Sequence, residues 1–166
     1  MTPLSDVEKS LRILKLHRRT IPNRCVIALT ELYDTKDAKK RQKLCLEINN
    51  LLCTHFSIPR CRVRVYSKNR PKMRGKGGGY LLGLYSNEAG ETSLIELWNY
   101  TINGRLVSSR YLFDTYLHEF VHHYDDRRLK LDLDHDAGFE ARLKFIQDLF
   151  FKKVQERKSN IKSRAV

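Results

Sequence analysis

The stretch that decides the fold is "FDTYLHEFVHHYDD", residues 113–126, which contains a His-Glu-x-x-His motif at positions 118–122. Apolar residues recur through it at helical spacing and form a broad arc. This pattern predicts a long helix, capped by Ser108 or Ser109 and running to about Leu129. The width of the arc indicates that the helix packs deep inside the domain and not on its surface.

The motif places chemically useful side chains on one part of this helix. His118 and His122 are four residues apart, so they project from the same side and could hold one metal ion together. Glu119 points to the side of the pair, where it could take a proton from an attacking water and pass it to a leaving amine. The spacing is typical of metal-assisted peptide hydrolysis. The alternative is a polar stripe that binds no metal.

A catalytic zinc site requires three protein ligands and one open position. The candidates for the third ligand are His123, Asp125, Asp126, His135, Asp136 and Glu140. His135 stands out because it follows a loop and opens the next predicted helix, which could fold back beside the pair. His123 points about 100° away from His122 at 3.6 residues per turn, and Asp125 could orient an imidazole from outside. The candidate oxyanion stabilisers are His123, Tyr124 and Arg142.

The segments "HEFVHHYDD" (118–126) and "HDAGFEARL" (135–143) together resemble the SprT-like zinc metallopeptidases, the family of Spartan-related protease domains. The resemblance implies one Zn²⁺ per chain, with His118, His122 and His135 as ligands and Glu119 as general base. It also implies an α+β fold, in which a small mixed or antiparallel sheet packs on the motif helix within a single zincin-like domain. The family often has glycine directly after the third histidine, whereas this chain has Asp136.

The first third of the chain is predicted to be mainly helical. Ser5 and Glu8 have capping-box spacing, which indicates the start of an amphipathic helix over residues 5–19. A clear helical period predicts another helix from about residue 37 to 56. Residues 25–33 are apolar and fit either a strand or a helix.

Short strands are expected in the middle of the chain. Arginine alternates with apolar residues in 60–67, which is typical of a half-buried strand. Two further strands are expected at 79–86 and 91–100. Within the last of these, residues 94–100 fit either an edge strand that pairs with an extended substrate or a plain core strand. A final amphipathic helix is expected from about Ala137 into the 150s.

The composition predicts one domain over residues 1–166. The 166-residue chain is 41% hydrophobic, which is enough for a substantial core. It has four cysteines without a Cys-x-x-Cys pair, no signal-peptide pattern and no apolar run of membrane-spanning length. We therefore expect a cytoplasmic or nucleoid- or nucleus-associated protein that is neither secreted nor bound to a membrane. The N-terminal helix (about 5–19), a protease core (about 25–151) and a fraying basic tail (about 152–166) would form this domain.

The net charge of +13 predicts attraction to polyanions, nucleic acid first. Residues 60–76 contain many basic side chains and no acidic ones. The candidate nucleic-acid contacts are Arg60, Arg62, Arg64, Lys68, Arg70, Lys72, Arg74 and Lys76. Tyr66 and Tyr80 could stack on unpaired bases. The alternative is a solvated loop whose charge contributes only solubility.

These patterns together predict a zinc-dependent endopeptidase that acts on nucleic-acid-associated proteins. One rival is a non-catalytic nucleic-acid-binding protein with a structural metal site. Another is a regulatory protease that cuts one specific partner, and a third is a folded domain without metal.

Overall fold

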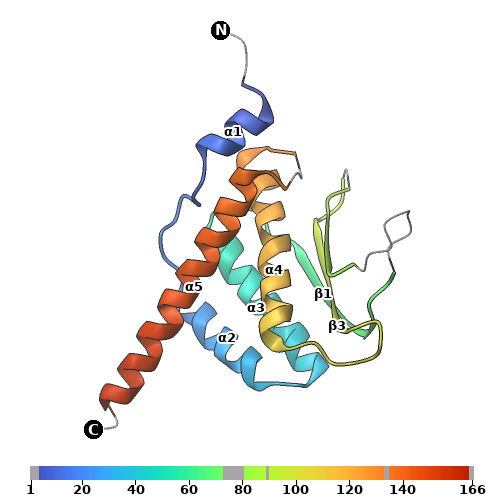
Figure 1. Cartoon of the computed structure of the whole chain (residues 1–166), viewed down its shortest axis with the longest axis vertical. Coiled ribbons are helices and arrows are strands. Elements are labelled where there is room, and N and C mark those ends of the chain that lie inside the picture. The colour runs from blue at the N-terminus through green and yellow to red at the C-terminus, as the bar shows by residue number, and fades with distance from the viewer. Residues whose placement is uncertain (1–3, 73–80, 89, 133–134, 165–166) are drawn as a thin grey trace.

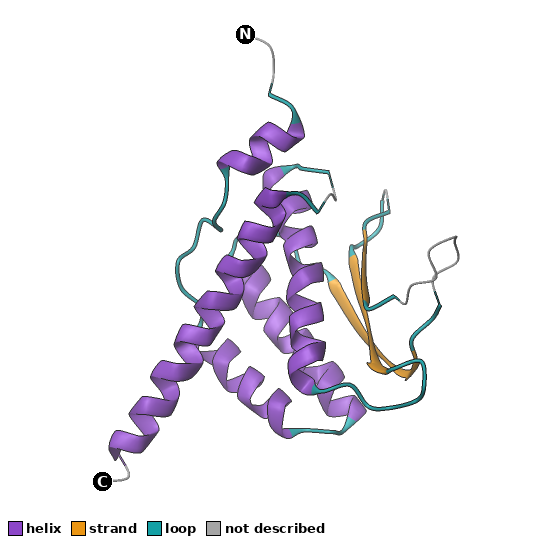
Figure 2. Cartoon of the chain, viewed as in Figure 1, coloured by secondary structure: helices purple, strands orange, loops and turns teal. Residues whose placement is uncertain are grey.

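The computed structural model describes residues 4–72, 81–88, 90–132 and 135–164 (Figure 1). Figure 2 shows that helices make up most of the chain and that the strands gather on one side. In order, the elements are α1 (Asp6–Arg12), α2 (Asn23–Asp34), α3 (Ala38–His55), β1 (Arg62–Asn69), β2 (Gly83–Ser86), β3 (Leu94–Tyr100), α4 (Ser109–Tyr124), the π-helical turn η1 (Asp125–Leu129) and α5 (Ala137–Arg164). The chain is therefore an α+β protein, as predicted.

The three strands form a mixed sheet in the order β1-β3-β2. β3 pairs in parallel with β1 and antiparallel with β2, so both of its edges are occupied. Of the two interpretations of residues 94–100, the core strand is the correct one. β2 is instead an edge strand, and it packs against α4.

Helix α4 occupies the centre of the fold, as its broad apolar arc predicted. It contacts the sheet on one side and α5 on the other, with α2 and α3 also packed against it (Figure 1). Its buried apolar side chains belong to one core cluster that also includes residues of α2, α3, α5 and the sheet. The α4 members of this cluster are Leu112, Phe113, Tyr116, Leu117, Phe120, Val121 and Tyr124. This packing fixes the helix that carries the motif.

The beginning of α4 is fixed by a cap and by a buried arginine. Ser108 accepts a hydrogen bond from the backbone N–H of Tyr111 at 3.1 Å, which satisfies a free donor of the first turn. Arg41 of α3 donates to the Val107 carbonyl oxygen at 3.0 Å and to Ser109 Oγ at 2.9 Å. The first turn of the helix is therefore tied to α3.

The N-terminal helix is shorter than expected. The capping box of Ser5 and Glu8 is present, but α1 ends at Arg12 and not near residue 19. The cause is Arg142 of α5, whose Nη1 donates to the carbonyl oxygens of Ser10 and Ile13 at 3.0 and 2.8 Å. A longer helix would use these carbonyl groups for its own hydrogen bonds.

The C-terminal prediction was wrong in the opposite direction. The final helix was expected to end in the 150s, but α5 continues to Arg164 and runs past the rest of the fold (Figure 1). Residues 139–164 contain neither glycine nor proline, and the ion pairs Lys144–Asp148 and Lys153–Glu156 support this helix at i,i+4 and i,i+3 spacing.

Two further predictions concern α2 and the end of the motif helix. The ambiguous residues 25–33 are helical and lie within α2. The predicted end of the motif helix near Leu129 is formed by the π-helical turn η1, which stops at Lys130 in the left-handed region with φ 56°. Within the residues that the structure describes, no helix is both long and apolar enough to cross a bilayer.

Candidate metal centre

The three histidines that the sequence singled out lie together. His118 and His122 project from the same side of α4, with ring centroids 5.0 Å apart. His135 comes from the loop before α5, and its Nε2 is 2.8 Å from Nε2 of His118 and 3.0 Å from Nε2 of His122. Three imidazole nitrogens therefore converge on one point, although the residues are up to 17 positions apart.

The start of α5 sets the position of His135. The next residue, Asp136, caps the helix by accepting a hydrogen bond from the backbone N–H of Phe139 at 2.7 Å. Phe139 then packs against all three histidine rings, with centroid distances from 4.4 to 5.0 Å. Asp136 also accepts a hydrogen bond from Ser10 Oγ at 2.8 Å, which links the cap to α1.

Two of the three histidines, His118 and His122, are favoured in the neutral state that a metal requires. Burial, followed by the charges of His118 and His135, lowers the pKa of His122 to about 3. Burial and His135 also lower the pKa of His118 from its ordinary value. Neutral imidazoles keep a lone pair for a metal. His122 is buried, His118 is half-buried and His135 is exposed, so solvent reaches the cluster on the His135 side.

The donor set itself suits zinc. Three imidazole nitrogens leave a tetrahedral ion with one open position, as in a catalytic zinc site. The residues therefore fit the Zn²⁺ that the motif implies.

Glu119 lies on the same helix in an apolar setting. Its side chain is 6% exposed, and burial raises its pKa to about 7. A hydrogen bond from the backbone N–H of Tyr85 in β2 acts in the opposite direction and favours the carboxylate. The carboxyl group is thus held between α4 and the edge strand.

Gly83 allows β2 to approach Glu119 this closely. A Cβ atom at Gly83 would lie 2.7 Å from Glu119 Oε1 and 2.8 Å from Thr115 Cγ2, which are both impossible contacts. Neither Gly83 nor Tyr85 was among the site residues predicted from the sequence. A glycine inside a predicted strand is a known indication of close backbone approach, so the signal was present for Gly83.

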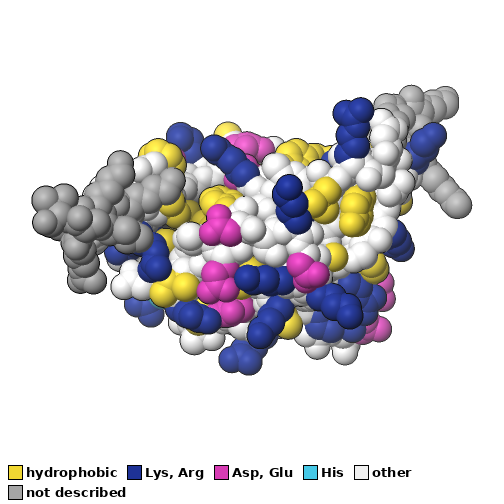
Figure 3. Space-filling model, turned by 90° about the horizontal axis from the view of Figure 1, so that it is seen from below, with side chains coloured by type: hydrophobic (Ala, Val, Ile, Leu, Met, Phe, Trp, Pro, Cys, Tyr) yellow, Lys and Arg dark blue, Asp and Glu magenta, His cyan; other side chains and the backbone are white. Residues whose placement is uncertain are grey.

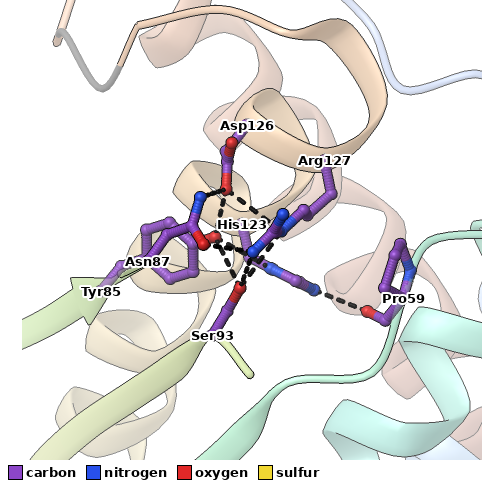
Figure 4. Close-up of polar contacts among 7 residues, drawn as sticks. All are labelled: Pro59, Tyr85, Asn87, Ser93, His123, Asp126 and Arg127. Atoms are coloured by element: carbon purple, nitrogen blue, oxygen red, sulfur yellow. Dashed lines mark hydrogen bonds and ion pairs between the residues drawn. The ribbon is translucent and has the colours of Figure 1, made fainter. Parts of the chain in front are cut away.

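A polar network holds β2 and the end of α4 together (Figure 4). Tyr85 Oη and Asn87 Nδ2 donate to Asp126 Oδ2 at 2.5 and 2.8 Å. Arg127 Nη2 donates to Ser93 Oγ at 2.6 Å and also contacts Asn87. Because Tyr85 is part of β2, this network also fixes the strand that packs next to Glu119.

The remaining predicted site residues have partners other than the three histidines. Both carboxylate oxygens of Asp125 accept hydrogen bonds from Arg142, at 2.8 and 2.6 Å, and not from an imidazole. Tyr124 Oη contacts the backbone N and Nδ1 of His17 at 3.2 and 3.0 Å. His123 is completely buried, with Nε2 2.7 Å from the Pro59 carbonyl oxygen. The proposed roles in orienting a ligand or stabilising an oxyanion therefore have no support from these contacts.

Part of the basic segment lies in β1, at one side of the sheet. The exposed side chains of Arg62, Arg64 and Lys68 alternate along β1. Lys68 Nζ lies 4.5 Å from the ring centroid of Tyr66, which stacks on Trp98 at 5.6 Å. Arg60 and Lys72 are also exposed, whereas Arg70 is half-buried over the Tyr111 ring. Arg74, Lys76 and Tyr80 lie outside the described residues.

Comparison of the chain with protein-family models, with curated proteins and with solved structures gives no match. The resemblance to the SprT-like metallopeptidases therefore rests on the motif residues alone. What the protein does has to be argued from the geometry of the site.

Proposed function

We propose that this protein is a zinc-dependent endopeptidase with a zincin-like core. The observation that carries the proposal is the convergence of three imidazole Nε2 atoms, at 2.8 and 3.0 Å, on the helix that also carries a buried carboxyl group. Two of these histidines and the carboxyl group belong to one His-Glu-x-x-His motif. Helical periodicity accounts for the pair, and the fold brings His135 beside it as the proposed third ligand.

His118, His122 and His135 would hold the ion, which supplies Lewis acidity and lowers the pKa of a water toward ~7. Glu119 would act as general base and then return the proton to the leaving amine. Its pKa of about 7 belongs to the protein without metal, and a nearby cation would favour the carboxylate that a base requires. The backbone N–H of Tyr85 holds this carboxyl group in place.

The edge strand β2 is the proposed site for an extended peptide. β3 pairs with one edge of β2, and no other strand of the described residues pairs with the second edge. An extended peptide could add to this edge through main-chain hydrogen bonds. Because β2 also contacts Glu119, such a peptide would lie close to the carboxyl group. The substrate-pairing role that the sequence offered for residues 94–100 is therefore proposed for Gly83–Ser86.

The test combines metal content with proteolysis of a fluorescently labelled unfolded protein. Wild type should cleave this substrate, and chelation should abolish cleavage. Glu119→Gln should retain zinc and lose activity by at least about 100-fold, a typical loss for a general base. His135→Ala should lose both activity and one equivalent of zinc. Undiminished cleavage by Glu119→Gln would overturn the proposal.

We also propose that the protein works close to nucleic acid, as a protease of nucleic-acid-associated proteins. The specific support is the row of Arg62, Arg64 and Lys68 on an edge strand, within a chain of net charge +13. Figure 3 shows that Lys and Arg side chains are also spread over the face seen from below, with fewer Asp and Glu among them. The charge supports attraction to phosphates and gives no base specificity.

A further inference from the structure

A second cluster of metal-binding side chains lies in the interior. Cys53 is in the last turn of α3, Cys61 directly precedes β1, and His123 follows His122 on α4. One potential ligand atom from each residue lies within 4.8 Å of the other two. Their exposed fractions are 0%, 4% and 0%, so all three are buried. None of them belongs to the histidine centre described above.

The hydrogen bonding around the two thiols is crowded. Asn49 donates through Nδ2 to the Cys61 carbonyl oxygen at 3.0 Å, which fixes the orientation of its amide. Its Oδ1 then faces three donors: Cys61 Sγ at 3.2 Å, Tyr116 Oη at 3.3 Å and Cys53 Sγ at 3.9 Å. A carboxamide oxygen has two lone pairs, so Oδ1 cannot accept from all three donors at once, and the thiols of Cys53 and Cys61 also interact with each other.

The ring of His123 is held in the way that is usual for a metal ligand. Such a ligand binds through one nitrogen while the other donates its hydrogen to a nearby oxygen. The Pro59 carbonyl oxygen lies 2.7 Å from Nε2, and Tyr85 Oη lies 3.2 Å from Nδ1 (Figure 4). Because a carbonyl oxygen can only accept, Nε2 carries the hydrogen that binds Pro59, and Nδ1 is the nitrogen with a lone pair for the ion.

We propose that Cys53, Cys61 and His123 form a second, structural zinc site, with Asn49 Oδ1 as the fourth ligand. Thiolate and imidazole are ligands that Zn²⁺ prefers. Binding would release the two thiol protons, and the two thiolates would balance the charge of the ion. The site would therefore be neutral overall, which makes its burial far less costly than that of a lone charge.

The position of this site suggests what it contributes. It would join the end of α3 and the start of β1 to α4, one residue from His122. Because the ligands are buried, the ion would be taken up as the chain folds. The effect expected is stabilisation of the sheet against the motif helix, without contact with a substrate.

Cobalt substitution separates the two sites, because thiolate ligands give Co²⁺ a near-ultraviolet charge-transfer band and imidazole ligands do not. Protein produced in cobalt-supplemented medium should show this band in wild type and in His135→Ala. The double variant Cys53→Ser/Cys61→Ser should lose it. Cys45→Ser removes an equally buried thiol of α3 and should keep it. Zinc content should fall from two ions per wild-type chain to one in His135→Ala.

X-ray absorption at the zinc edge provides a second measurement that does not depend on the folding of the cysteine variant. His135→Ala should show two sulfur neighbours at about 2.3 Å. The proposal is overturned if zinc in wild type and in His135→Ala has only nitrogen and oxygen neighbours, or if His135→Ala holds no zinc. None of these readouts uses protease activity, so they remain decisive if the endopeptidase proposal fails.

Discussion

Glu119 shows how one residue can be costly for stability and useful for chemistry. Its folded-state pKa is about 7, compared with an ordinary value of 4.5, because it is buried. Below pH 4.5 the carboxyl group is protonated in both states. As pH rises from 4.5 to 7 the unfolded chain releases its proton first, so the folded state loses stability. Above pH 7 the loss is complete, at roughly 3 kcal/mol.

Glu119→Gln should therefore stabilise the metal-free protein. The amide has the same shape and no titratable proton. In protein treated with a chelator, we expect the variant to gain roughly 3 kcal/mol over wild type at pH 8 and almost nothing at pH 4. Urea unfolding of both proteins at pH 4, 6 and 8 measures the difference. A difference that stays constant over this range would show that Glu119 is not responsible for it.

Gly83→Ala should damage catalysis through β2. The added Cβ would collide with Glu119 and Thr115, at 2.7 and 2.8 Å, so either the strand or the carboxyl group must move. A displacement of this kind is expected to reduce kcat/KM by about 10- to 100-fold while zinc content stays unchanged. Leu84→Ala is the matched control, since Leu84 lies on the same strand and is 38% exposed. Equal activity of the two variants would contradict this role for Gly83.

At the scale of elements, a buried ion pair between η1 and α5 positions the arginine that binds the end of α1. Asp125 and Arg142 lie 2.6 Å apart with side chains only 3% and 1% exposed, and Arg142 also bonds Ser10 and Ile13. Arg142 therefore connects α1, α5 and the end of the motif helix. Gly138 of α5 also lies against Ser10. A Cβ atom at Gly138 would lie 2.4 Å from the Ser10 carbonyl oxygen, so a larger residue would not fit there.

Asp125→Ala should destabilise the protein strongly. The change leaves the Arg142 guanidinium buried without its counterion, which is expected to cost about 3–5 kcal/mol. Asp148→Ala removes an exposed ion pair with Lys144 of the same helix and should cost less than about 1 kcal/mol. Denaturant unfolding gives both free energies. If the two variants were equally stable, the pair would not be the attachment that we describe.

The elements also show which features of the fold can be predicted from local sequence patterns. Periodicity predicted α3, α4 and the three strands, and it placed His118 and His122 on one face. It did not predict that α1 ends at Arg12, because the cause is an arginine 130 positions further along the chain. Periodicity did not predict the strand order either, since nothing within residues 94–100 distinguishes a central strand from an edge strand. Contacts across the fold decide both features.

The same limit applies to the site. His135 could be anticipated, because the loop between two predicted helices is short enough to return the chain to the motif. Asp125 was expected beside an imidazole, since the sequence does not show that Arg142 lies closer to it. Gly83 was missed because its importance depends on the packing of β2 against α4. Residues fixed by one helix or by a short connection were therefore predicted, whereas the surroundings of Asp125 and Gly83, which other elements supply, were not.

At the scale of the whole molecule, charge is the dominant property. The net charge of +13 attracts polyanions over a long range, and β1 presents the exposed side chains of Arg62, Arg64 and Lys68. Lys68 lies over the Tyr66 ring, which orders part of this row. If long-range attraction acted alone, the loss of affinity would not depend on which positive charges are removed. A binding surface on β1 would depend on these three residues.

We expect the protein to bind single-stranded DNA with an affinity that falls steeply between 50 and 200 mM salt. Each phosphate contact contributes about 0.7 to the slope of log K against log salt for a single strand. Changing Arg62, Arg64 and Lys68 together to alanine should therefore lower the slope by about 2. The control changes Lys36, Lys39 and Lys40, which are equally charged and exposed but lie around the start of α3. Fluorescence anisotropy over a salt series measures both variants. Equal losses would show that net charge acts alone, whereas a larger loss for the β1 variant would place the contact on the sheet.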